Sequence, residues 1–125
     1  MNNSLEQYKN LIDEIKFCGR ITFRDKFFIF IGNFTTSEQN RNYDISRLRG
    51  KITKKLEKAD ICVVGFSLQE GDNYERSIAD LQTAMDLEER CRKPLIISES
   101  IFNKNIKDAF EEKFLWEALD NQRLD

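Results

Sequence analysis

Seven basic residues fall within eighteen positions in the middle of the chain, between residues 41 and 58. Only Asp44 and Glu57 oppose them, so this segment carries a local charge of +5 while the rest of the chain carries −7. Lysine and arginine side chains attract phosphates and other anions, and an uneven charge distribution steers such partners. A short charged run is more often only a solvated face, so both interpretations stay open. The candidate basic surface consists of Arg47, Arg49, Lys51, Lys54, Lys55 and Lys58.

The chain contains no histidine, and its three cysteines show no CxxC spacing. Catalysis by Ser–His or Cys–His pairs and metal binding by histidine are therefore excluded. The cysteine spacing predicts neither a disulfide framework nor a zinc site. Any catalysis would rest on carboxylates, lysines or a lone thiol. This favours a non-enzymatic protein, and we expect no catalytic residues, no metal and no cofactor.

The length of 125 residues allows one domain. The first twenty residues include Glu6, Asp13 and Glu14 and no apolar run, so no secretory signal is predicted. No segment approaches the roughly 18 apolar residues of a membrane span. We expect an intracellular protein without a membrane partner, cytoplasmic in a bacterium or nuclear in a eukaryote.

Three apolar segments predict buried strands, at residues 26–32, 59–65 and 94–98. They are apolar on both faces, which is typical of central strands covered by helices on each side. Two shorter candidates are an edge strand at 20–23 and a strand at 51–53. Helical spacing of apolar residues predicts helices at 4–17, 37–48, 73–90 and 98–121. Strands alternating with helices indicate an α/β fold with a parallel sheet between two helical layers.

Several positions within these elements carry more specific expectations. Thr35 and Glu38 are spaced as a capping box, as are Asp72 and Glu75. Gly50 fits a helix C-cap, where a left-handed backbone favours glycine. In the helix at 37–48 we expect Tyr43, Ile45 and Leu48 to be buried, and in the last helix Phe102, Ile106, Phe110, Phe114 or Leu115, and Leu119. The apolar residues near the C-terminus, including Trp116, are expected to pack, with a dimer seam as the alternative.

Four segments occur in an order that resembles a BRCT domain, the interaction module of DNA-repair and replication proteins. They are "KFFIFIGNF", "RGKITKKLEKADICVVG", "YERSIADLQTAMDL" and "KPLIISESIF". The resemblance covers roughly residues 24–107, with helical extensions at 1–23 and 108–125. It implies a four-stranded parallel sheet of order 2-1-3-4 with helices on both faces and extra N- and C-terminal helices. It also implies a protein partner that is a repair or replication factor, and it leaves a homodimer open.

The sequence departs from the BRCT pattern at the positions that bind phosphopeptides. Ile31 stands where binding members carry serine or threonine, and Ala79 stands where they carry lysine. A phosphate needs donors and positive charge, which neither side chain supplies. Arg49 also replaces the first glycine of a usual pair. What the resemblance leaves is a degenerate phosphate pocket of Gly32, Asn33, Arg76 and Ser77, near acidic residues, and we predict no standard phosphopeptide binding.

Two alternatives stay open. Some BRCT members bind DNA ends, including 5′-phosphorylated ones, through a basic surface and a helix that precedes the domain. The basic surface of this chain and its helix at 4–17 resemble these two features. The segment from Lys58 to Ile97 also resembles Rossmann-like nucleoside deoxyribosyltransferases. In that interpretation Glu75 is the nucleophile and Asp72 its neighbour, although the glycine-rich first loop of that family is absent.

Overall fold

The computed structural model describes residues 3–66, 74–90 and 93–123, with side chains described for 6–66, 77–90 and 93–119. In chain order the elements are α1 (Asn3–Asp13), β1 (Phe27–Ile31), α2 (Glu38–Arg47), β2 (Lys51–Ile52), a 3-10 turn (Leu56–Lys58), β3 (Ile61–Val64), α3 (Tyr74–Glu89), β4 (Leu95–Ser98) and α4 (Glu99–Arg123). The four strands form one parallel sheet of order β2-β1-β3-β4. The predicted fold class and strand order are confirmed, whereas residues 20–23 form no strand.

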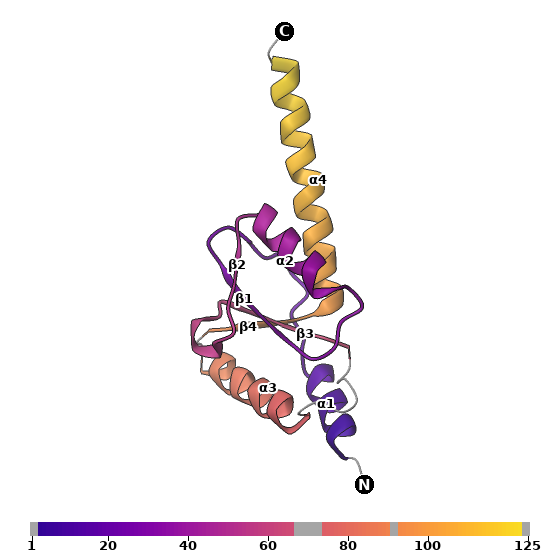
Figure 1. Cartoon of the computed structure of the whole chain (residues 1–125), viewed down its shortest axis with the longest axis vertical. Helices are drawn as coiled ribbons and strands as arrows, with labels where there is room; N and C mark the ends of the chain where they lie inside the picture. Colours follow the sequence, from indigo (N-terminus) through magenta and orange to yellow (C-terminus); the bar gives the residue numbers. More distant parts are fainter. Residues whose placement is uncertain (1–2, 67–73, 91–92, 124–125) are drawn as a thin grey trace.

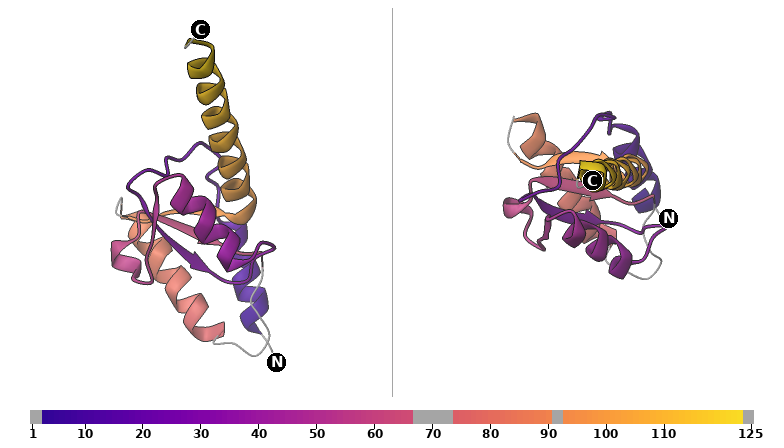
Figure 2. Two further views of the ribbon diagram at one scale, coloured as in Figure 1. Left: turned by 45° about the horizontal axis from the view of Figure 1, so that its top comes forward. Right: turned by 90° about the horizontal axis from the view of Figure 1, so that it is seen from above.

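The sheet lies between two helical layers, as Figure 1 and Figure 2 show. Successive side chains of a strand point to opposite faces, so each strand contributes to two cores. On one face Ile29, Cys62 and Ile96 pack with α1 and α3. On the other face Phe28, Val63 and Ile97 pack with α2 and the start of α4. This double burial is the reason why the strands are apolar on both sides.

Helix α1 is fixed to the sheet by Tyr8, whose side chain is fully buried. The Tyr8 hydroxyl lies 3.0 Å from the carbonyl oxygen of Gly65 and 3.3 Å from that of Ile31, so one hydroxyl reaches the ends of both central strands. Burial raises the pKa of Tyr8, so the hydroxyl keeps its proton and donates it. The helix ends at Asp13, four residues earlier than predicted.

Helix α2 begins at a different cap from the one predicted. Ser37, not Thr35, is the N-cap residue, and its Oγ accepts a hydrogen bond from the Asn40 N–H at 3.1 Å. Thr35 instead donates its N–H and hydroxyl to the buried carboxylate of Glu99, at 2.9 and 2.8 Å. The loop after β1 is therefore attached to the start of α4, because one carboxylate accepts hydrogen bonds from several donors.

The end of α2 places a left-handed residue at Arg49 (φ 66°), not at Gly50 as predicted. The Arg49 N–H donates to Ser46 O and the Gly50 N–H to Ile45 O, a Schellman motif in which Arg49 takes the position usually held by glycine. A non-glycine residue there costs roughly 1–2 kcal/mol. Gly50 is required for space, since an added Cβ would lie 2.8 Å from the Ile45 side chain and 2.9 Å from Phe23 O.

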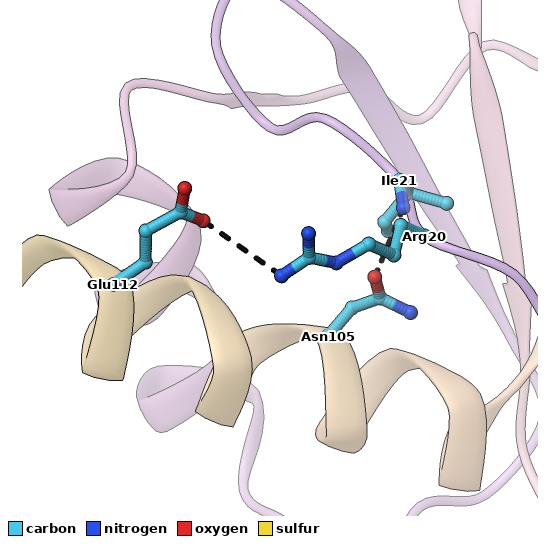
Figure 3. Close-up of polar contacts among 4 residues, drawn as sticks. All are labelled: Arg20, Ile21, Asn105 and Glu112. Carbon is cyan, nitrogen blue, oxygen red and sulfur yellow. Dashed lines mark hydrogen bonds and ion pairs between the residues drawn. The ribbon is translucent and has the colours of Figure 1, made fainter.

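Helix α4 starts on the sheet and then leaves it (Figure 1). Phe102 is buried and makes edge-on contacts with the rings of Phe23, Phe28 and Phe30. Asn105 is also buried and accepts a hydrogen bond from the Ile21 N–H at 2.9 Å, with Arg20 and Glu112 paired nearby (Figure 3). Ile106 packs against the same core and Phe110 is half-buried. The predicted packing is wrong farther along the helix, where Phe114, Leu115 and Leu119 are exposed, as is Trp116.

Candidate functional site

A hollow of about 330 Å³ lies at the carboxyl end of β1, beyond the point where β2 stops. Ligands of open parallel sheets commonly bind outside the carboxyl ends of the strands. Its lining comes from both central and edge elements: Ile29, Phe30, Ile31, Gly32, Phe34, Glu38, Arg41, Asn42, Ile52, Thr53, Lys54 and Asp80. Polar or charged residues and apolar residues contribute equally to this lining, so the hollow suits a polar or charged ligand with some apolar surface.

The hollow exists because β2 is much shorter than β1. Only Lys51 and Ile52 pair with β1, opposite Phe27 and Phe28. Ile52, the second residue of this edge strand, is 39% exposed. The remainder of β1 is thus bordered by β3 on one side and by the hollow on the other.

The backbone of Phe30 faces this open side. The carbonyls of Lys26 and Phe28 accept hydrogen bonds from Lys51 and Thr53 on the β2 side, whereas those of Phe27 and Ile31 accept from the β3 side. Since this direction alternates along a strand, the N–H and C=O of Phe30 point past the end of β2. Among the described residues, none forms a hydrogen bond with either group beyond β2.

Arg41 is the unusual side chain of the hollow. It is only 9% exposed, and its guanidinium carbon lies 4.2 Å from the ring centroid of Phe34 and 5.0 Å from that of Phe30. Its Nη1 donates to the carbonyl of Thr36, while its buried Nε has no hydrogen-bond partner among the described residues. Burial lowers the pKa of Arg41, and the negative charges of Glu38 and Glu99 oppose this shift. The buried cation is thus only partly satisfied.

Of the residues of the predicted phosphate pocket whose side chains the structure describes, only Gly32 lines the hollow. Gly32 lines the hollow with a left-handed backbone (φ 94°), and Asn33 lies half-buried with its backbone packed against Gly65. Ser77 is half-buried in α3 and does not line the hollow. The side chain of Arg76 lies outside the described residues, as do Asp72 and the side chain of Glu75. From α3 the hollow instead receives Asp80, which opposes a dianionic phosphate.

The six residues of the basic surface are all exposed, around the end of α2, β2 and the 3-10 turn: Arg47, Arg49, Lys51, Lys54, Lys55 and Lys58. None of them forms an ion pair within the part of the chain that the structure describes. Lys54 belongs to this surface and also lines the hollow. The Lys51 ammonium lies 5.5 Å from the ring centroid of Phe27, so part of its side chain covers the sheet edge.

Two further titratable groups have structural roles. Cys62 lies in the segment 59–65 that was predicted as a buried strand, and burial raises the pKa of Cys62 to about 12, so it remains a thiol. Burial would raise the pKa of Asp60, but the Lys93 hydrogen bond at 2.7 Å and that of the Phe27 N–H at 2.8 Å outweigh it and lower the pKa. Asp60 therefore joins β1 and β3 at the amino end of the sheet, opposite the hollow.

Arg41 was missed as a site residue, although the sequence contained a signal. Arg41, Ile45 and Leu48 are spaced by four and three residues, the period of one helix face. We placed Tyr43 on that face, but Tyr43 is two residues from Ile45 and is 60% exposed. An arginine at an inward position between apolar residues indicates a buried cation, and a buried cation requires a partner.

The comparisons with known proteins add no assignment: neither family models nor curated proteins match this chain. Among the described residues, no group of three or more cysteine, aspartate or glutamate side chains is arranged to hold a metal ion. Within that same part of the chain, every helix is too short or too polar to cross a bilayer.

Proposed function

We propose that this protein is a non-enzymatic interaction module of the BRCT type that binds a protein partner in DNA repair or replication. The observation that carries the proposal is the parallel strand order β2-β1-β3-β4 between two helical layers, which is the topology that the BRCT resemblance implies. The open edge of β1 and the hollow beside it supply an interaction surface. Standard phosphopeptide binding is not part of the proposal, because Ile31 is buried and Asp80 lines the hollow.

The proposal is tested by site-specific photo-crosslinking in living cells of the source organism. A photoreactive phenylalanine analogue is placed at Asn42, which lines the hollow, and at the exposed Lys16 as the matched control. We expect Asn42 to crosslink a protein of DNA repair or replication, identified by mass spectrometry, and Lys16 not to do so. Further probes at Lys55 and Trp116 cover the basic surface and the end of α4. If no repair or replication protein is crosslinked from any of these positions, the proposal is wrong.

DNA-end binding is the second candidate, and the observation that favours it is the group of exposed lysines without ion pairs in the described part of the chain. Binding of a 5′-phosphorylated duplex should then weaken as salt rises, because phosphate contacts release counterions. Replacing both Lys54 and Lys55 by glutamate should reduce the slope of log affinity against log salt by about 2. The same changes at Lys104 and Lys107, exposed on α4, serve as the control. Equal loss in both variants, or no salt-dependent binding, would reject this candidate.

A further inference from the structure

We propose that the open edge of β1 binds an extended acidic peptide of the partner as an added strand, with one carboxylate of that peptide held by Arg41. The inference rests on the proposed interaction function and names the chemistry of its partner. It combines two features that lie side by side in the hollow: the free backbone of Phe30 and the incompletely paired guanidinium of Arg41.

The backbone determines the form of the ligand. A strand edge with free N–H and C=O groups pairs with another extended segment, and peptide ligands use such edges. Thr53 ends the pairing with β1, since its N–H still donates to Phe28 O at 2.9 Å. An added segment would continue from this point and pair with Phe30. Gly32 follows with a left-handed backbone, so the segment that pairs is short.

Apolar side chains beside this edge suit alternate residues of the added segment. Ile29, Ile31 and the exposed Ile52 line the hollow. Since side chains of an added strand alternate between two faces, one face of the peptide would contact the aromatic group around Arg41 and the other would turn toward α3. β-Branched residues favour the extended conformation and can make these apolar contacts, so we expect them on both sides of the acidic residue of the peptide.

Charge determines the acidic residue. Nη1 of Arg41 is used by the Thr36 carbonyl, which leaves the edge formed by Nε and Nη2, and Nε lacks an acceptor among the described residues. Because Nε is buried, the Arg41 side chain must turn toward the hollow to present this edge to a ligand. A carboxylate accepts two hydrogen bonds from such an edge. Lys54 adds a second positive charge to the hollow.

Two acidic residues of the hollow decide between a carboxylate and a phosphate. Glu38 and Asp80 line the hollow and are exposed to solvent, so water screens them, whereas Arg41 lies where charges interact more strongly. Lys54 is exposed as well, so its attraction is screened like the repulsion of the two carboxylates, and the buried charge of Arg41 decides the attraction for a singly charged carboxylate. A doubly charged phosphate is larger and meets more repulsion from the two carboxylates.

The test uses two capped nine-residue peptides, STVTDTVTS and its STVTNTVTS counterpart, titrated into the 15N-labelled full chain. We expect the aspartate peptide to shift the backbone resonances of Phe30 and Gly32 and the Nε–H resonance of Arg41. Loss of one charge-assisted hydrogen-bonded pair corresponds to about tenfold in affinity, so the asparagine peptide should bind about tenfold more weakly.

The matched variants are Arg41→Met and Arg47→Met, which remove a buried and an exposed arginine from the same helix. The preference for aspartate over asparagine should disappear in Arg41→Met and persist in Arg47→Met. Equal binding of both peptides to the unmodified chain, or no shift at Phe30 and Gly32, would overturn the inference even if Arg41→Met failed to fold. A repair protein crosslinked from Lys55 or Trp116 together with inert peptides would reject this inference alone. Peptide binding without any crosslinked repair protein would reject the proposed function instead.

Discussion

The two halves of α4 have similar apolar content but opposite surroundings. In the first half, Phe102 is 1% exposed and Asn105 is buried against the segment before β1. In the second half, Phe114, Leu115 and Trp116 are 57–60% exposed, on a helix that continues away from the sheet (Figure 1). The contrast shows the limit of helical spacing as a signal. It identifies apolar residues on a helix, but it does not tell whether the rest of this chain packs against them.

Phe102 should show the largest effect in this comparison. Replacing it with alanine removes its contacts with three aromatic rings and leaves a cavity between the sheet and α4. We expect the free energy of unfolding to fall by about 3–5 kcal/mol. Urea denaturation followed by circular dichroism measures this. A loss below about 1 kcal/mol would mean that the first half of α4 is not part of the core.

Asn105 should come next. Its Oδ1 accepts from the Ile21 N–H (Figure 3). Its Nδ2 donates to the carbonyls of Gly19 and Ile101, so Asn105 attaches the segment before β1 to α4. Asn105→Ala leaves these groups unpaired and should cost about 1–3 kcal/mol. Asn103→Ala, at a half-buried position on the same helix, is the control and should change stability by less than about 0.5 kcal/mol. Equal losses would contradict the role of Asn105.

The second half should affect association and not folding. Replacing both Leu115 and Trp116 by serine should leave the free energy of unfolding of a dilute sample within about 0.5 kcal/mol of the unmodified chain, because both side chains are already more than half exposed. If a second copy covers these residues, sedimentation should show a dimer that this double variant loses. A chain that stays monomeric up to its solubility limit would exclude the homodimer that the sequence left open.

The ion pair between Arg20 and Glu112 should have the smallest effect. The two side chains are 77% and 57% exposed, and their charged atoms are 3.9 Å apart (Figure 3). Exposed pairs of this kind contribute at most about 1 kcal/mol and often nothing. Glu112→Gln should therefore change the free energy of unfolding by less than about 0.5 kcal/mol. A larger loss would place the boundary between the two halves beyond Glu112.

The strands were predictable and the ends of the helices were not. Runs such as 59–65 are apolar on both faces, and only a sheet covered by two layers buries such residues, so the α/β fold follows from local pattern. The Arg49 and Ser37 caps depend on how the chain turns against Phe23 and Glu99, which are distant in the sequence. The hollow depends on the early end of β2, and a two-residue strand leaves no periodic signal. Arg41 was within reach, since its helical position could be counted.

The hydroxyl of Tyr8 has a consequence for how far the protein can be trimmed. Its partners, Ile31 O and Gly65 O, terminate the two innermost strands, so a fragment that starts at residue 24 would leave both carbonyls without this donor and would uncover the α3 side of the sheet. Such a fragment would expose the apolar sheet surface that α1 covers, and this surface would favour aggregation or binding of a helix from another protein. A shortened chain that is to stay folded without aggregating must therefore retain α1.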